Sequence, residues 1–136
     1  MRLAIILSLL TIGTAAPAAP DAHVVPPAPK EFRLVGDAKR GEAIYTPLCA
    51  SCHGKTGDGR GIIGKALTPP PRDFTDPKHM AAMSDWELFL AVSSGGTSVG
   101  LSATMPAWSS TLKEQDIHDV VVFVKTFCEK KKGSAK

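Results

Sequence analysis

The sequence has few of the features that usually staple or anchor a small protein. It contains three cysteines, two tryptophans and one tyrosine in 136 residues. Three cysteines are too few for the dense disulfide framework of a small secreted scaffold. The longest apolar run, Leu3 to Leu10 extended by Ile12, is about ten residues, half of the roughly twenty that a membrane-spanning helix needs. No segment alternates apolar and polar residues as a strand does. These absences favour an all-α domain.

The charge balance is only mildly basic. Lysine and arginine number 16 against 13 acidic residues, for a formal net charge of +3. Much of this excess comes from a run at the extreme C-terminus, at Lys130, Lys131, Lys132 and Lys136. Such runs are usually solvated tails, and no basic stripe is interleaved with aromatic residues. We therefore expect no nucleic-acid partner.

The N-terminus has the layout of a secretory leader. Arg2 precedes the apolar run, and Ala16-Pro17-Ala18 offers small residues for cleavage before Ala19. We expect residues 1–18 to be a signal peptide, 19–35 a flexible Ala/Pro-rich segment, 36–128 the folded domain and 129–136 a Lys-rich tail. The mature protein would be periplasmic without stable membrane insertion. The alternative is a leader retained as an anchor.

Three helices are expected in the domain. Asp37 is a good N-cap for a helix over 38–49, and Ser84 with Glu87 forms a capping box for a helix over 84–93 that stops at Gly95. A third helix over 113–128 has one apolar face. That face consists of Ile117, Val120, Val121, Val124 and Phe127.

The pentapeptide Cys49-Ala50-Ser51-Cys52-His53 carries the chemistry. In a Cys-x-x-Cys-His motif the two thiols can add across the two vinyl groups of protoporphyrin, and the histidine can then ligate the iron. We expect one haem c, bound covalently through Cys49 and Cys52 and ligated by His53. An exported location agrees with this chemistry.

Three other interpretations of the motif are weaker. A zinc site needs four ligands at tight spacings, and no second tight pair accompanies Cys49 and Cys52. A thioredoxin-like dithiol would follow a strand, but no strand precedes Cys49. A plain disulfide would leave His53 without a role.

The second iron ligand remains open from the residues alone. Met105 lies in an expected loop and precedes Pro106, which favours extended backbone. A methionine thioether would raise the reduction potential relative to a second histidine. His79 is the best competitor, while His118 is expected on the polar surface of the last helix. Met80 and Met83 are expected to fill the core.

The chain resembles the class I, cytochrome-c-like family of bacterial monohaem proteins over about residues 36–127. The resemblance rests on residues 41–45 (GEAIY), 49–54 (CASCHG), 57–59 (GDG), 71–74 (PRDF), 105–108 (MPAW) and 116–124. It implies three to four helices wrapped around one haem, with Gly41 at a helix crossing and Tyr45 against Phe123. It also implies that Met105 is the sixth ligand.

The resemblance extends to the surroundings of the haem. It implies that a carbonyl of the triplet Pro69 to Pro71 accepts a hydrogen bond from the imidazole N–H of His53, which would orient the ring. Arg72 and Trp108 are candidates to bind the haem propionates.

With both axial positions filled, the iron would have no site for a substrate. We therefore expect a one-electron carrier rather than an enzyme, with redox proteins as partners and a monomeric state. Lys55, Arg60 and Lys65 would steer the encounter. The alternatives are a haem-containing ligand sensor, with Met105 labile, and a haem subunit of a larger oxidoreductase.

Overall fold

The computed structural model describes residues 24–133, which contain five α-helices, two short 3-10 helices and no β-strand. The α-helices are α1 (Ala38–Leu48), α2 (Ala50–His53), α3 (Pro77–Ala81), α4 (Asp85–Ser94) and α5 (Glu114–Gly133), and the 3-10 helices are η1 (Gly64–Ala66) and η2 (Gly96–Val99). The all-α prediction is confirmed. More helices occur than the three to four expected, because α2 and α3 are too short to leave a periodic pattern. The predicted signal peptide, residues 1–18, lies outside the described residues.

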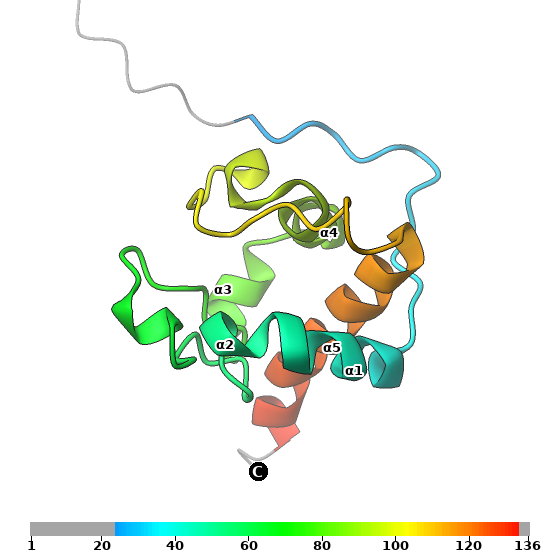
Figure 1. The fold of residues 1–136 in the computed structure, drawn as a ribbon. Coiled ribbons are helices and arrows are strands. Elements are labelled where there is room, and N and C mark those ends of the chain that lie inside the picture. Colours follow the sequence, from blue (N-terminus) through cyan, green and yellow to red (C-terminus); the bar gives the residue numbers. More distant parts are fainter. Residues whose placement is uncertain (1–23, 134–136) are drawn as a thin grey trace, which may run out of the picture.

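Helix α1 crosses α5 at close range (Figure 1). Gly41 lies at the crossing, where a Cβ atom would collide with the backbone oxygen of Asp119 and with the side chain of Phe123. One turn later, the Tyr45 ring packs against Phe123 at 5.2 Å and against Phe127 at 5.3 Å between ring centroids. The crossing at Gly41 and the Tyr45–Phe123 contact implied by the family resemblance are confirmed.

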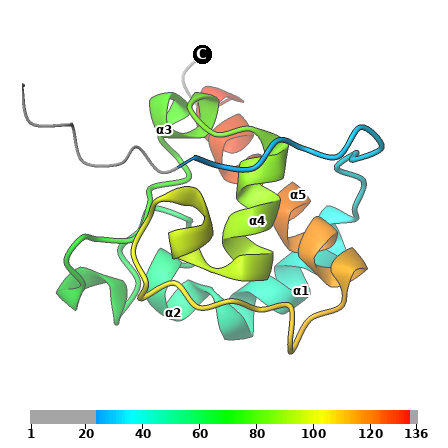
Figure 2. The ribbon, with the colours of Figure 1, turned by 90° about the horizontal axis from the view of Figure 1, so that it is seen from above.

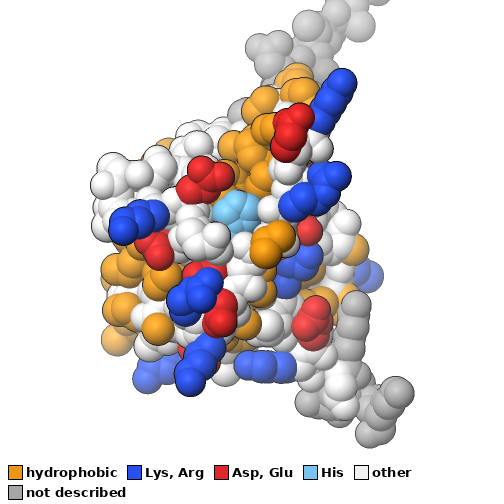
Figure 3. All heavy atoms as spheres, turned by 90° about the vertical axis from the view of Figure 1, so that its right-hand side faces the viewer, with side chains coloured by type: hydrophobic (Ala, Val, Ile, Leu, Met, Phe, Trp, Pro, Cys, Tyr) orange, Lys and Arg blue, Asp and Glu red, His pale blue; other side chains and the backbone are white. Residues whose placement is uncertain are grey.

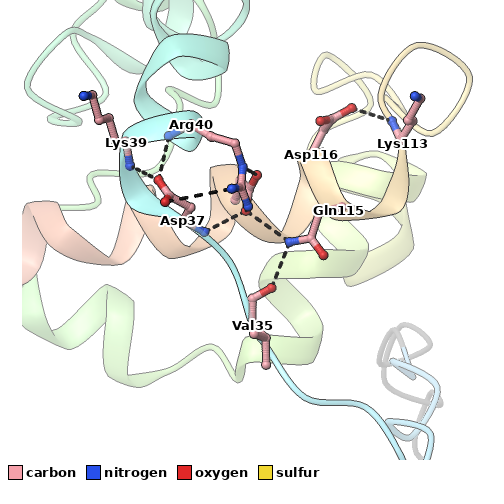
Figure 4. Close-up of polar contacts among 8 residues, drawn as sticks. Val35, Asp37, Lys39, Arg40, Lys113, Gln115 and Asp116 are labelled. Carbon is pink, nitrogen blue, oxygen red and sulfur yellow. Dashed lines mark hydrogen bonds and ion pairs between the residues drawn. The ribbon is translucent and has the colours of Figure 1, made fainter.

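A buried carboxylate joins the start of α1 to α5 (Figure 4). Asp119, whose side chain is 1% exposed, accepts hydrogen bonds from Asp37 N at 2.7 Å and from Arg40 Nε at 2.7 Å. Arg40 Nη2 and Gln115 Nε2 each donate to it at 3.1 Å. The hydrogen bonds from Arg40 are the main reason that the pKa of Asp119 falls to about 2. Because this pairing links residues far apart in sequence, it sets how the two helices meet.

The starts of the helices follow the capping residues. Asp37 accepts from two backbone N–H groups of α1, and Ser84 with Glu87 forms the expected capping box of α4. At the start of α5, the N–H of Lys113 donates to the Asp116 carboxylate at 3.0 Å. This contact matches the one in which the N–H of Ser84 donates to the Glu87 carboxylate at the start of α4. Helix α5 then continues to Gly133, so residues 129–133 of the expected tail are helical.

Residues 24–35 form an extended N-terminal strap across α4 and α5 (Figure 2). Trp86 Nε1 donates to the Pro26 carbonyl at 2.9 Å. The Phe32 ring packs against Trp86 at 4.9 Å, against Phe89 at 5.4 Å and against His118 at 5.7 Å between ring centroids. This part of the segment that we expected to be flexible is therefore held by contacts distant in sequence.

The strap also covers His118, which is therefore less exposed than expected. Its side chain, expected on the surface, is 12% exposed, and its Nδ1 accepts from Val35 N at 3.4 Å. Figure 3 looks onto this side of the molecule and shows hydrophobic side chains gathered beside a histidine. The aromatic rings of Phe32 and Phe89 cover the imidazole, which a reading of α5 alone could not show.

Candidate functional site

The motif at 49–53 continues the path of α1 into α2 (Figure 1). The Cys49 N–H donates to the Tyr45 carbonyl at 2.8 Å, and the His53 N–H donates to the Cys49 carbonyl at 2.9 Å. Helical residues three apart face the same side, so the thiols of Cys49 and Cys52 lie one turn apart with His53 beside them. Both are free and partly exposed. Burial raises the pKa of the Cys49 thiol to about 11, which keeps it protonated at neutral pH.

A glycine-rich loop folds back over the end of α2. The N–H groups of Gly59, Gly61 and Ile63 donate to the carbonyls of His53, Cys52 and Ser51 at 2.9, 3.1 and 2.9 Å. These bonds satisfy carbonyls that the end of a helix leaves open. A Cβ atom at Gly61 would collide with the Ser51 backbone. The loop can lie this close to α2 because it carries no side chain there.

The His53 ring is stacked on one side and has a buried nitrogen without a hydrogen-bond partner within residues 24–133. It stacks on Phe74 with 4.7 Å between ring centroids and 14° between planes. Burial lowers the pKa of His53, and a smaller opposing effect comes from the backbone of Arg72. The ring is therefore neutral at pH 7, the form in which histidine ligates metals. Its Nδ1 is buried and has no partner that meets hydrogen-bond geometry, so the Arg72 backbone is near it without being fully aligned.

Two contacts of the site were missed in the sequence. Phe74, which the sequence marks only as part of the motif at 71–74, stacks on His53, and its N–H donates to the Gly57 carbonyl at 2.7 Å. The buried hydroxyl of Tyr45 donates to the Gly54 carbonyl at 2.7 Å, directly after His53. In the sequence, each contact is visible only as an aromatic residue some way from a glycine, a pattern too common to predict a particular contact.

Met105 lies on a separate loop between η2 and α5, above α2 in Figure 1. Its N–H donates to the Ser102 carbonyl at 3.2 Å, and its carbonyl accepts from Gly96 N at 3.0 Å. Farther along, the Trp108 N–H donates to the Val92 carbonyl at 3.0 Å. The Met105 segment is thus bonded to η2 at Gly96 and to α4 at Val92. The Met105 side chain is half-buried.

The residues present fit a haem. Between residues 51 and 73 every buried residue is a glycine, so the apolar side chains of this loop have no protein core to enter. Ile62 is 87% exposed and Ile63 50%, and Leu101 on the Met105 loop is 38% exposed. Arg72 Nε, like His53 Nδ1, is buried without a hydrogen-bond partner among the described residues. An apolar ring carrying carboxylates would cover these side chains and supply an acceptor for Arg72.

The competing iron ligands have other surroundings. His79 is half-exposed, with Nδ1 3.7 Å from an Asp76 oxygen. His118 lies under the strap, and Met80 packs against both core clusters. Within residues 24–133 no group of three or more His, Cys, Asp or Glu side chains could hold a metal ion. Among these residues no helix is both long and apolar enough to cross a bilayer.

Comparisons with known proteins identify the domain. Residues 36–124 match the family described as cytochrome C oxidase, cbb3-type, subunit III. A search of curated proteins found no match. The resemblance to class I c-type cytochromes and the small cytochrome c fold are thereby confirmed.

Two solved structures have a similar fold. A chain of the Kuenenia stuttgartiensis reducing HAO-like protein complex Kustc0457/Kustc0458 superposes with a TM-score of 0.57 at 27% identity, over 71% of this chain and 44% of that one. The KustC0563 c-type cytochrome superposes with a TM-score of 0.54 at 24% identity, over 64% of this chain and 95% of that one. The second likeness shows the fold alone. In the first comparison, this chain covers less than half of the length of the chain from the HAO-like complex.

Proposed function

The chain belongs to the cbb3-type cytochrome c oxidase subunit III family of haem-binding electron-transfer domains, and on that premise we propose that it is an exported one-electron carrier. It holds one haem c through Cys49 and Cys52, with His53 and Met105 on the iron. The observation that supports this most is the free Cys49 and Cys52 pair, one helical turn apart, beside the neutral, partly buried His53.

Each residue has a distinct task in this proposal. Cys49 and Cys52 would hold the haem through two thioether bonds, each S–H adding across one vinyl group so that no atom is lost. His53 supplies a neutral nitrogen, and stacking on Phe74 keeps its ring from turning. When bound, the haem supplies an iron that gains and loses one electron. Met105 would supply a second iron ligand from a loop whose Trp108 N–H is bonded to α4, and with both ligands coming from the protein the iron would offer a substrate no open site.

The nearby polar groups complete the site. The predicted carbonyl acceptor for His53 lay within Pro69 to Pro71, and the backbone of Arg72, the next residue, partly opposes the burial that lowers the pKa of His53. We therefore extend that proposal from Pro69 and Pro71 to Arg72. The orphan Nε of Arg72 would donate to a propionate. Trp108, half-buried on the Met105 loop, is the second propionate donor proposed.

The proposed setting is the periplasm, with residues 1–18 removed on export and the remaining chain monomeric. Its partners are redox proteins that approach the loop of Ile62 and Ile63. Lys55, Arg60 and Lys65 are all exposed on this loop and would steer a partner of opposite charge.

A Met105→Ala variant tests the ligand set. Wild type should show a low-spin ferric spectrum with a weak near-infrared sulfur-to-iron band and a reversible one-electron couple in potentiometry. The variant should lose that band, bind carbon monoxide when reduced and have a lower potential. Met83→Ala, a sulfur deletion outside the loop, is the control and should leave the band in place. An unchanged band in Met105→Ala would remove Met105 from the iron, and the absence of a reversible couple would remove the carrier function.

A second candidate is a haem subunit of a larger oxidoreductase. It is favoured by the similarity to a chain that was solved within the HAO-like protein complex. Native mass measurement of the protein from its own cells distinguishes the two. A stable larger assembly supports the subunit, and a species of the mass of one chain with haem supports the free carrier.

A further inference from the structure

The sulfur atoms that the haem site does not use lie together elsewhere. Among residues 24–133, sulfur occurs in Cys49, Cys52, Met80, Met83, Met105 and Cys128. The proposed haem site accounts for Cys49, Cys52 and Met105. The other three, Met80, Met83 and Cys128, all line one pocket between α3, the start of α4 and the end of α5. All the described sulfur atoms outside the proposed haem site thus belong to residues that line the same pocket.

The size of this sulfur-lined pocket limits what it can hold. Its volume is about 210 Å³, below the roughly 300–1,000 Å³ of pockets that bind organic ligands of drug size. Cys128, which is 7% exposed, is part of the lining, and Pro77 and Leu88 provide apolar wall. A pocket of this volume excludes an organic ligand of drug size and leaves room for an ion or a very small molecule.

The charges of the lining favour a cation. Asp85 and Glu129 contribute two carboxylates and Lys125 one ammonium group. Lys125 is paired with Asp85, which leaves Glu129 to balance a bound positive charge. No imidazole lines the pocket among the described residues, since His79 is not part of the lining.

The donor atoms select one metal. One thiolate and two neutral thioethers form a soft set, which suits Cu(I), whereas Zn²⁺ is held by thiolates, imidazoles and carboxylates. We propose that Met80, Met83 and Cys128 form a three-sulfur binding site for Cu(I). Binding exchanges the Cys128 S–H proton for the ion, so one proton leaves for each Cu(I) bound, and no electron is transferred.

The position of Cys128 also disfavours the other use of a lone thiol. An intermolecular disulfide needs a sulfur that a second chain can reach, but Cys128 is buried on the inner side of α5 near Phe127. A small ion can bind side chains that line a pocket, whereas a disulfide to a second chain needs an exposed sulfur. The geometry thus separates metal binding from cross-linking.

Anaerobic titration of the haem-loaded protein with Cu(I), against a chromophoric Cu(I) chelator, tests the site. We expect one tightly bound Cu(I) per chain, one proton released and only sulfur neighbours in copper X-ray absorption. Cys128→Ser should weaken binding more than about 100-fold, beyond what loss of an outer hydrogen-bond partner costs. Met80→Leu and Met83→Leu, which keep the volume, should each weaken it, and Cys128→Met should retain part of it.

His79→Gln is the matched control, because His79 neighbours Met80 on α3 and stays outside the pocket. It should bind Cu(I) as wild type does. An unaltered haem spectrum and far-ultraviolet circular dichroism show that each variant is folded. Wild-type affinity in Cys128→Ser or in the double variant Met80→Leu, Met83→Leu would overturn the proposal, as would equally tight binding of Zn²⁺ or loss of Cu(I) binding in His79→Gln.

Discussion

Replacing Asp119 with asparagine keeps the shape of the side chain but removes the charge that joins α1 to α5. In the folded protein the pKa of Asp119 is about 2 against an ordinary 3.8, first because of the hydrogen bonds from Arg40. Each pKa unit corresponds to about 1.4 kcal/mol, so the ionised carboxylate contributes about 2 kcal/mol to the free energy of unfolding at neutral pH. The Arg40 side chain is 61% exposed, so solvent screening makes this the upper end of the range.

The sign follows from the direction of the shift. The pKa of Asp119 is lower in the folded than in the unfolded chain, so its contribution is complete above the unfolded pKa. It is lost as the pH falls through the folded pKa, over a window from about pH 5 to about pH 1. Wild type should therefore approach the stability of Asp119→Asn on acidification.

Urea unfolding of the haem-loaded protein, followed by far-ultraviolet circular dichroism between neutral and acid pH, measures this difference. Taking wild type minus Asp119→Asn cancels the titration of other groups and of the iron ligands. Arg40→Gln should remove part of the effect, because the Asp37 and Gln115 donors remain. Lys39→Gln, a neighbouring charge whose backbone alone contacts Asp37, is the control. A difference between wild type and Asp119→Asn that does not change with pH would refute the reasoning.

Three further substitutions test the packing. Gly41→Ala places a methyl group into the α5 backbone and should cost about 1–3 kcal/mol in urea unfolding at pH 7; unaltered stability would contradict this close crossing. Ser84→Ala removes the capping box of α4 and should cost about 1 kcal/mol, with the exposed Ser110→Ala as control; equal effects would contradict the cap. Phe32→Ala should release the strap, seen as faster hydrogen exchange at the Trp86 indole with an unchanged haem spectrum; unchanged exchange would show that Phe32 does not hold it.

The helices that could be predicted are those with a capping residue and several turns. Asp37 and the Ser84–Glu87 pair placed the starts of α1 and α4 because a cap and its partner lie within one turn of each other. The start of α5, at Glu114, is one residue from the expected 113, and there the N–H of Lys113 donates to the Asp116 carboxylate. Its extension past residue 128 was missed because lysines, although good helix formers, also predict a solvated tail.

The N-terminal strap shows where local pattern is insufficient. Its Ala/Pro composition predicts extended backbone, which is what the structure has, but composition does not say against what the segment packs. The Pro26 carbonyl meets Trp86 sixty residues later, and the Val35 N–H meets His118 at a separation of 83. The same contacts moved His118 from surface to near-burial. Such pairings depend on the crossing of α4 and α5, which no single segment encodes.

The proposed haem site leaves a clearer mark in the sequence than the fold around it, for a physical reason. A covalent attachment needs particular atoms in a fixed order, so Cys49, Cys52 and His53 announce it within five residues. The loops of residues 51–73 and 97–116 need only to leave room for the proposed haem, which demands no particular residue at most positions. Between residues 51 and 73 only glycines are buried, and between 97 and 116 no residue is buried. These segments are held by backbone hydrogen bonds to α2 and α4 rather than by a core of their own. The proposed haem would give their apolar side chains an apolar group to cover, which would couple the ordering of both loops to haem binding, while the α1–α5 crossing has its own core.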